Sequence, residues 1–272
     1  MGILKELYRR FELLLHKPRH WQLRPDTIDR RIFREVVIHN EYELPARFDR
    51  RDVVLDVGAH IGSFALAALR RGAGSVYCCE ANPDNFRLLQ ANLRPYANRV
   101  RTSEFAVWRS DRPVAYLHFQ NPTPRNTGAG AVSTEPDGLM VAARAFDDLI
   151  AGAVADGRRV RLVKLDCEGS EWPILFTSRM LHLVDSLCGE YHWVDAAGPF
   201  AVAGHPQFTP AVLERFLSEQ GFRVRTRPMT KDPSAGLFFA ERDARRAFAL
   251  PTPPNGTETG KAVPAAASQR LS

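Results

Sequence analysis

The chain alternates between short apolar runs of strand length and segments whose apolar residues recur at helical spacing, a pattern typical of α/β proteins. Its clearest stretch is an apolar run at 53–57, a turn with Gly58 and Gly62, a helical segment at 64–69, and a second run at 75–79 that ends in Glu80. This order of strand, glycine turn, helix and strand predicts an open sheet that binds ligands beyond the carboxyl ends of its strands.

The same alternation continues along the rest of the chain. It predicts strands at 100–108, 114–119, 139–143, 160–166, 186–192, 222–226 and 236–240. It predicts helices at 3–15, 26–38, 83–93, 146–150, 174–176 and 209–220, with Asn82 as the cap of the third. Segment 120–138 is rich in Asn, Pro, Thr and Gly, so we expect a long loop there.

The pattern divides the chain into three regions. We expect a helical extension or lid at 1–45, an α/β domain at 46–248, and a disordered tail at 249–272, where Pro, Thr, Gly, Ala and Ser dominate. The helix at 3–15 has one apolar face, with Lys5, Arg9 and Arg10 elsewhere. Residues 1–20 therefore either contact a membrane surface weakly or pack on the domain or a second subunit, and the oligomeric state stays open.

Composition narrows the classes of function. The net charge is +6, but the basic residues are spread along the chain without an RNA-binding signature, so we expect no nucleic acid partner. The four cysteines form no C-x-x-C pair, which argues against a zinc site. No signal peptide and no apolar run of about 18 residues is visible, which predicts a cytoplasmic protein without a transmembrane segment.

The glycine turn indicates which cofactor the chain binds. A dinucleotide fingerprint needs G-x-G-x-x-G, but His60 and Ser63 occupy the later glycine positions. Asp56 precedes the turn and would repel a pyrophosphate but attract an ammonium group. Gly58 and Gly62 let the backbone approach a bulky ligand, and Glu80 can accept both hydroxyls of a ribose. These features favour S-adenosylmethionine; the alternative is an NAD-dependent or non-catalytic Rossmann-fold nucleotide-binding protein.

Three motifs in sequence order carry a family resemblance. They are D-V-G-A-x-x-G from Asp56, Glu80 with Asn82-Pro83 behind it, and V-K-L-D-C-E-G-S-E from Val163. With them the chain resembles the FkbM family of methyltransferases over roughly 42–191. The resemblance implies S-adenosylmethionine as cofactor and a Rossmann-like, seven-stranded, mostly parallel sheet with an antiparallel last strand and helices on both faces. It also implies O-methylation of a small-molecule or glycan acceptor, such as a sugar, polyketide or other natural product.

The resemblance also implies roles for particular residues. It assigns the methionine end of the cofactor to Asp56, Gly58 and Gly62, the ribose to Glu80, and the adenine to Ala106 and Val107. It places Asp166 near the transferred methyl group. We expect further cofactor contacts from neighbours of these motifs, namely Tyr42 as a lid residue, Ala59, Ala81 and Asn82.

A hydroxyl acceptor has to lose a proton, and Asp166, Glu190 and His192 are the candidate bases because each lies at a predicted strand end. Asp166, Glu168 and Glu171 could hold Mg²⁺ if all three converged. Gly169 indicates that the strand stops before Glu171, and capping of the following helix by Glu168 and Glu171 is the favoured interpretation. We therefore expect no metal site.

Overall fold

The computed structural model describes residues 2–121, 123–155, 157–230 and 234–243. A seven-stranded sheet forms its centre, with the strand order β10-β11-β9-β8-β1-β2-β3. β11 runs antiparallel to both of its neighbours, and the other paired strands are parallel, which confirms the predicted sheet. Across the sheet the strands are β10 (Phe222–Pro228), β11 (Ala235–Arg242), β9 (Ser186–His192), β8 (Arg159–Leu165), β1 (Asp52–Val57), β2 (Ser75–Glu80) and β3 (Val100–Glu104).

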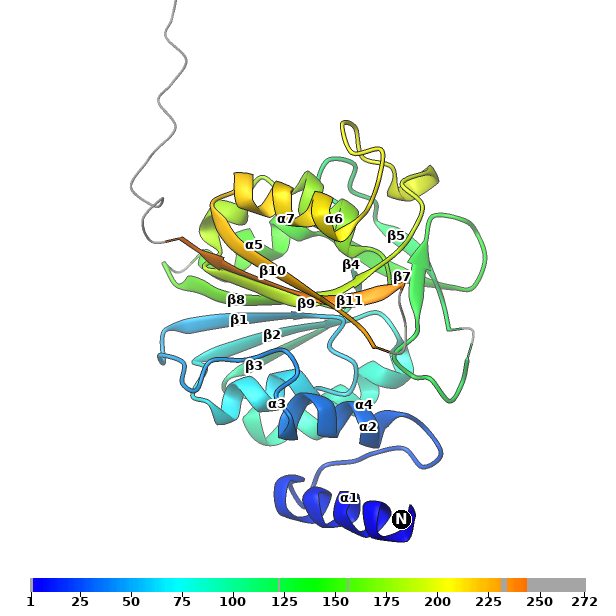
Figure 1. Cartoon of the computed structure of the whole chain (residues 1–272), viewed down its shortest axis with the longest axis vertical. Coiled ribbons are helices and arrows are strands. Elements are labelled where there is room, and N and C mark those ends of the chain that lie inside the picture. Colours follow the sequence, from blue (N-terminus) through cyan, green and yellow to red (C-terminus); the bar gives the residue numbers. More distant parts are fainter. Residues whose placement is uncertain (1, 122, 156, 231–233, 244–272) are drawn as a thin grey trace, which may run out of the picture.

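Helices cover both faces of this sheet, with α2, α3 and α4 on one side and α5, α6 and α7 on the other (Figure 1). Every residue of β1 is buried, because alternate side chains of a parallel strand enter the apolar cores on the two faces. The helices are α1 (Gly2–His16), α2 (Asp29–Phe33), the π-helix η1 (Arg34–Ile38), α3 (Ser63–Arg70), α4 (Pro83–Leu93), α5 (Phe146–Val154), α6 (Glu171–Thr177) and α7 (Pro210–Glu219), with short 3₁₀ turns η2 (Arg94–Tyr96), η3 (Leu181–Leu183) and η4 (Gly198–Phe200).

A second, four-stranded sheet has the order β4-β7-β5-β6. Two predictions fail here. The strand expected at 100–108 is split at Phe105, because the chain leaves the main sheet after β3 and pairs with β7 instead. The loop expected at 120–138 contains β6, whose three residues are too few to show a period. The strands are β4 (Ala106–Trp108), β5 (Tyr116–Gln120), β6 (Ala131–Ser133) and β7 (Leu139–Ala145).

The N-terminal extension differs from its prediction in two ways. The helix expected at 26–38 begins at Asp29 and continues as a π-helix from Arg34. α1 attaches to this segment through Glu12, whose carboxylate lies 2.6 Å from the guanidinium of Arg34. The prediction that the apolar face of α1 packs on the domain is wrong for the described residues. Large apolar side chains of this helix are exposed, namely Leu7, Tyr8, Phe11, Leu14 and Leu15.

None of the described helices combines the length and apolar character needed to cross a membrane. The predicted tail at 249–272 lies outside the described residues.

Candidate active site

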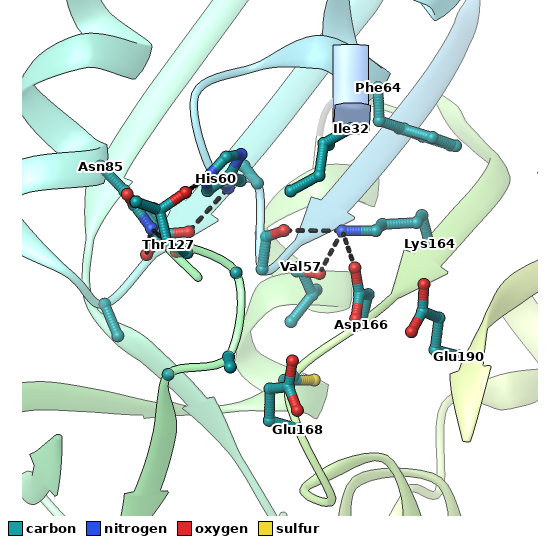
Figure 2. A pocket seen from close by; sticks show the side chains of 18 of the residues that line it. Ile32, Val57, His60, Phe64, Asn85, Thr127, Lys164, Asp166, Glu168 and Glu190 are labelled. Carbon is teal, nitrogen blue, oxygen red and sulfur yellow. Dashed lines mark hydrogen bonds and ion pairs between the residues drawn. The ribbon is translucent and has the colours of Figure 1, made fainter. Parts of the chain in front are cut away.

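A cavity of about 500 Å³ lies at the carboxyl ends of β1, β2, β8 and β9. Its walls come from segments far apart in the chain: the turn after β1, the extension, the loop at 126–130 and the turn after β8 (Figure 2). Ligands of open α/β sheets bind in this position, so the cavity is the candidate active site. Most residues predicted to bind the cofactor or to act in catalysis line it, namely Tyr42, Gly58, Ala59, Glu80, Ala81, Ala106, Val107, Asp166, Glu190 and His192.

Chain packing requires both glycines of the turn, and the close approach of a cofactor to them stays a prediction. Gly58 has φ +73°, and a Cβ there would lie 1.8 Å from the carbonyl oxygen of Asp166. Gly62 has φ +95°, and its Cβ would press on the side chains of Leu89 and Leu93 in α4. Gly58 still lines the cavity, whereas Gly62 is not among its lining residues.

Glu80 ends β2 and is fixed by its neighbours. Its carboxylate accepts hydrogen bonds from the backbone N–H of His60 (2.7 Å), the backbone N–H of Asn82 (2.8 Å) and Nδ2 of Asn85 (3.4 Å). Burial raises the pKa of Glu80 to about 7, although these hydrogen bonds favour the charged form. A carboxylate held this way can accept ribose hydroxyls with its remaining lone pairs.

Asn82 caps a helix and is not among the residues that line the cavity. Its side chain accepts the backbone N–H of Asp84 at 2.9 Å and also that of Asn85, which makes it the N-cap of α4, as predicted. Pro83 occupies the first helical position, where a missing N–H costs nothing. The cap therefore sets the direction of the helix that begins beside Glu80.

Ser63 is a cavity residue that sequence reasoning missed. It is the first residue of α3, and its hydroxyl is buried without a hydrogen-bond partner among the described residues. The free N–H groups of a helix N-terminus favour a negatively charged ligand group at this place. The available signal was its position directly after the glycine turn.

Lys164 is the second missed residue. Its ammonium lies 2.6 Å from the carbonyl oxygen of Gly58, 3.3 Å from that of Val57, and 3.4 Å from a carboxylate oxygen of both Asp56 and Asp166. Burial alone would lower the pKa of Lys164, but the two carboxylates raise it, so the side chain is a cation. The signal was a lysine inside an otherwise apolar strand.

Asp56 is not among the residues that line the cavity. It is fully buried beneath the turn, where burial raises its pKa and Lys164 opposes the rise. In this position it pairs with Lys164, and direct contact with the methionine end of the cofactor stays a prediction.

Tyr42 connects the extension to the acidic end of the cavity. Its hydroxyl lies 3.0 Å from Oδ2 of Asp166 and 3.3 Å from Oε1 of Glu190, so it can donate to either carboxylate. The two carboxylates in turn raise the pKa of Tyr42 further above the level that burial alone would give. The phenol therefore stays protonated and remains a donor.

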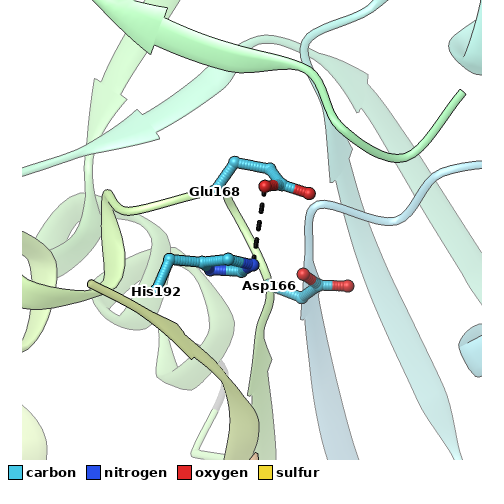
Figure 3. A group of neighbouring side chains, drawn as sticks. All are labelled: Asp166, Glu168 and His192. Atoms are coloured by element: carbon cyan, nitrogen blue, oxygen red, sulfur yellow. Dashed lines mark ion pairs between the residues drawn. The ribbon is translucent and has the colours of Figure 1, made fainter. Parts of the chain in front are cut away.

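His192 lies among carboxylates, of which Figure 3 shows those of Asp166 and Glu168. Its Nε2 lies 3.5 Å from an oxygen of both Glu168 and Glu190, and its Nδ1 lies 3.4 Å from Oε1 of Glu171. Burial alone would lower the pKa of His192, but these carboxylates raise it to about 12. The surrounding carboxylates therefore favour the protonated imidazole, and a role of His192 as the base stays a prediction.

Glu168 and Glu171 take different roles, which corrects the expectation that both cap the helix. Glu171 accepts the backbone N–H groups of Cys167 (2.6 Å) and Gly169 (2.8 Å) and so holds the turn. Glu168 has φ +53° and lines the cavity, and burial raises its pKa to about 8 despite the nearby His192. The three carboxylates that could have held Mg²⁺ do not converge, since Glu171 holds the turn and its Oε1 lies 3.4 Å from Nδ1 of His192.

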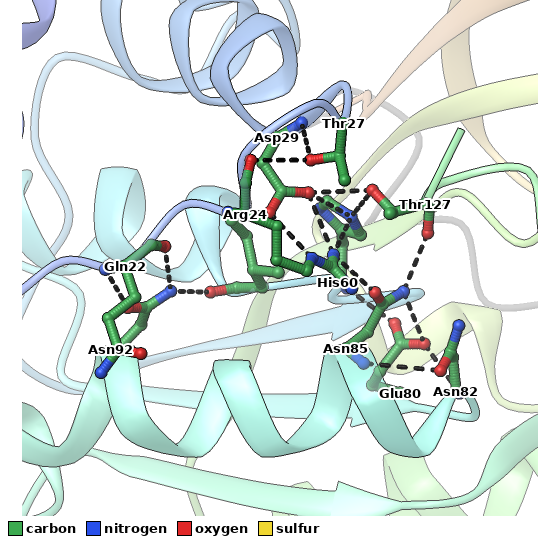
Figure 4. A network of polar contacts seen from close by, with 11 residues as sticks. Gln22, Arg24, Thr27, Asp29, His60, Glu80, Asn82, Asn85, Asn92 and Thr127 are labelled. Carbon is green, nitrogen blue, oxygen red and sulfur yellow. Dashed lines mark hydrogen bonds and ion pairs between the residues drawn. The ribbon is translucent and has the colours of Figure 1, made fainter. Parts of the chain in front are cut away.

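A polar network fastens the extension across the opposite end of the cavity (Figure 4). Arg24 donates to the buried carboxylate of Asp29 (2.9 Å) and to Oδ1 of Asn85 (2.8 Å). Thr127 donates its hydroxyl to Asp29 (2.9 Å), and its carbonyl oxygen accepts from Asn85 (3.0 Å). His60 contacts Thr127 at 2.8 Å. The extension, the glycine turn, α4 and the loop at 126–130 thus meet beside Glu80.

The sheet with its antiparallel β11, and the cavity at the carboxyl ends of its parallel strands, define a Rossmann-like fold of the class I methyltransferase type. The model of the methyltransferase FkbM domain matches residues 56–224, which is more than half of the chain. The chain therefore belongs to the FkbM methyltransferase family.

Individual relatives are more distant. "Methyltransferase 1" of Beauveria bassiana (strain ARSEF 2860) is 25% identical over 231 residues, which are 76% of this chain and 87% of the relative. The crystal structure of methyltransferase FkbM from Methylobacillus flagellatus KT covers 76% of this chain at 18% identity with a TM-score of 0.46, and this chain spans 47% of that protein. The structure of M. capricolum TrmK with S-adenosyl-homocysteine has 8% identity and a TM-score of 0.39, over 71% of this chain and 62% of that one. Scores this low do not support a comparison of individual residues.

The family implies S-adenosylmethionine as cosubstrate, and the cavity residues fit it. The unpartnered hydroxyl of Ser63 at the start of α3 suits the methionine carboxylate. Glu80 suits the ribose hydroxyls, and apolar residues beside it suit the adenine ring, namely Ala81, Phe105, Ala106 and Val107.

Proposed function

We propose that this methyltransferase transfers the methyl group of S-adenosylmethionine to a hydroxyl oxygen of a sugar, polyketide or other small natural product. The observation that carries the proposal is one continuous cavity with Glu80 at one end and Asp166 and Glu190 at the other. The first end suits a nucleoside, and the second offers carboxylates to a hydroxyl group.

When bound, S-adenosylmethionine supplies an electrophilic methyl carbon, whose C–S bond breaks with its electron pair left on sulfur while an acceptor lone pair forms the new C–O bond. The protein mainly aligns these atoms, since a near-attack separation of about 3 Å accounts for much of the rate of an in-line displacement. Glu80 and Ser63 hold the two ends of the cofactor, and Lys164 fixes the turn between them.

Glu190 takes the acceptor proton in this proposal, and Asp166 orients the hydroxyl group. Both carboxylates line the cavity, and the hydroxyl of Tyr42 lies within hydrogen-bond distance of both. A positioned carboxylate typically contributes a rate factor of about 10² to 10⁴ as a general base.

Calorimetry with S-adenosylmethionine tests the cofactor half of the proposal. Glu80→Ala is expected to abolish binding, because it removes the acceptor of both ribose hydroxyls. Undiminished affinity would contradict the ribose role. Asp166→Asn and Glu190→Gln are expected to keep cofactor binding and lose turnover of a methylated acceptor, so a fully active variant would remove that residue from the mechanism.

Mass spectrometry of ligands that co-purify with the protein tests the class of cofactor. S-adenosylmethionine or S-adenosylhomocysteine is expected. A nicotinamide cofactor in the cavity would replace the proposal by the alternative of an NAD-dependent enzyme. Incubation of candidate glycosides and polyketides with cofactor labelled in the methyl group would then identify the acceptor.

A further inference from the structure

We propose that Asp166, Glu168 and His192 bind one divalent cation that holds the hydroxyl oxygen of the acceptor. The inference rests on the proposed function, because the cation would present the acceptor of that reaction to the methyl group. It departs from the sequence-based expectation of no metal site.

The first support is that three possible ligand atoms, each from a different side chain, lie close together. One atom from each of Asp166, Glu168 and His192 lies within 4.8 Å of the other two, and Nε2 of His192 is 3.5 Å from Oε2 of Glu168. Ligands of one ion that lie about 2.0 to 2.6 Å from it show separations of this size. An imidazole together with two carboxylates is a mixed set that suits first-row divalent ions such as Mn²⁺.

The second support is the way the imidazole is held. Nδ1 of His192 lies 3.4 Å from Oε1 of Glu171, near enough to pair but without hydrogen-bond geometry, and that carboxylate is fixed by two backbone N–H groups of the turn after β8. Nε2 is directed at Glu168, as Figure 3 shows, and it also lies 3.5 Å from Oε2 of Glu190. Metal-binding histidines almost always have their second nitrogen oriented by such an outer carboxylate or carbonyl.

The third support is the balance of charge at this end of the cavity. Asp166, Glu168 and Glu190 supply three carboxylates, and the ammonium of Lys164 is shared among Asp56, Asp166 and two carbonyl oxygens. Tyr42 and Lys164 both contact Oδ2 of Asp166, which leaves Oδ1 for a further ligand.

The position also fits the acceptor and not the cofactor. Asp166 and Glu168 follow β8 and His192 ends β9, whereas Glu80 ends β2, on the other side of β1. Three protein ligands leave coordination positions open, and an acceptor oxygen bound there would have its O–H bond weakened by the cation. The O–H bond would then break with its proton passing to Glu190, and the oxygen lone pair would form a bond to the methyl carbon as the C–S bond breaks and its electron pair stays on sulfur.

Binding of Mn²⁺ to the full-length protein tests the proposal directly. Electron paramagnetic resonance is expected to show one bound Mn²⁺ per chain, and pulsed measurements are expected to show coupling to a nitrogen nucleus. Glu168→Gln should weaken Mn²⁺ binding at least tenfold, and His192→Gln should also remove the nitrogen coupling. Glu35→Gln is the matched control, since Glu35 lines the same cavity but pairs with Arg31 at 3.1 Å, and it should bind Mn²⁺ as the wild type does.

Two outcomes would overturn the inference: no Mn²⁺ bound by the wild type at millimolar concentration, or bound Mn²⁺ without nitrogen coupling. The second outcome also decides the matter if a variant fails to fold, because it needs only the wild-type protein. Calorimetry with S-adenosylmethionine in parallel separates the two proposals. Cofactor binding without Mn²⁺ binding would refute the cation alone, and Mn²⁺ binding without cofactor binding would refute the proposed function alone.

Discussion

Lys164 shows at the scale of one residue how the site is held together. One ammonium contacts the carbonyl oxygens of Val57 and Gly58 and the carboxylates of Asp56 and Asp166. The sequence shows a lysine in an apolar strand, with Asp166 two residues later. Its other three partners lie in β1 or directly after it, far earlier in the chain, and become visible only when the register of β1 and β8 is known.

Removing this charge should destabilise the fold. Lys164→Met leaves the buried carboxylate of Asp56 and the partly buried carboxylate of Asp166 without their cation. We therefore expect the free energy of unfolding to fall by about 3 kcal/mol, measured by urea denaturation. Arg161→Met on the same strand is the control, because that guanidinium is only partly buried and bonds to the hydroxyl of Ser186. Equal losses in the two variants would show that Lys164 has no special role.

Gly58 allows a second prediction at this scale. Gly58→Ala combines a positive φ with a Cβ 1.8 Å from a backbone oxygen, so the turn after β1 or that after β8 has to move. We expect a loss of at least about 2 kcal/mol in the free energy of unfolding. Gly152→Ala in α5 has no atom within 4 Å of the new Cβ and should be neutral or stabilising by about 0.5 to 1 kcal/mol. Thermal melting of both variants would test the difference in sign.

At the scale of elements, local signals predicted well and long-range pairings did not. Asn82 followed by Pro83 marks the start of α4 because capping involves only neighbouring residues. The strand at 186–192 was predicted with both of its ends. The division of 100–108 between two sheets depends on pairing of β4 with β7, more than thirty residues later, and no local pattern encodes it. The convergence of Glu168 with His192 was missed for the same reason.

Asp29 holds the N-terminal extension against the rest of the site. Asp29→Ala removes the buried carboxylate that Arg24 and Thr127 both contact. Loss of a charged hydrogen bond costs about 1.5 to 3 kcal/mol. Because the extension meets the glycine turn beside Glu80, we expect its loosening to lower the affinity for S-adenosylmethionine roughly tenfold or more. Hydrogen exchange should become faster in 24–45 and 126–130. Glu241→Ala, which breaks an exposed pair with Arg223, should change neither quantity, and an unchanged Asp29 variant would contradict the anchoring role.

For the whole molecule, the buried His60 makes stability depend on pH. Burial lowers the pKa of His60 to about 4 from its usual 6.5, and the nearby Asp29 only partly opposes this. The unfolded chain therefore takes up the proton first as pH falls below about 6.5. The contribution of His60 to stability is complete above that pH and is lost progressively towards about pH 4, by up to about 3 kcal/mol.

Denaturation between pH 4 and 7 would test this contribution. His60→Asn is a suitable variant, because asparagine tolerates the positive φ of +50° at this position. Its free energy of unfolding should fall less steeply with acid than that of the wild type. Parallel curves for the two proteins would mean that acid sensitivity arises at other groups.

The exposed apolar side chains of α1 also matter for the whole molecule. Leu7, Phe11, Leu14 and Leu15 are each more than half exposed. The proposed weak membrane contact through residues 1–20 predicts that the protein sediments with anionic liposomes and that a variant lacking these residues does not. Equal sedimentation of both forms would rule out this contact.

The phenol of Tyr42 lies at the end of the cavity proposed to hold the acceptor. It reaches Asp166 and Glu190 from a segment that precedes the sheet, while Ser63, Glu80 and Lys164 belong to the sheet and its first helix. A different N-terminal segment on the same sheet would change the hydrogen-bond donor that faces Asp166 and Glu190. Exchange of that segment would alter which incoming molecules fit this end of the chamber, whereas Glu80 and Lys164 keep their places in the sheet.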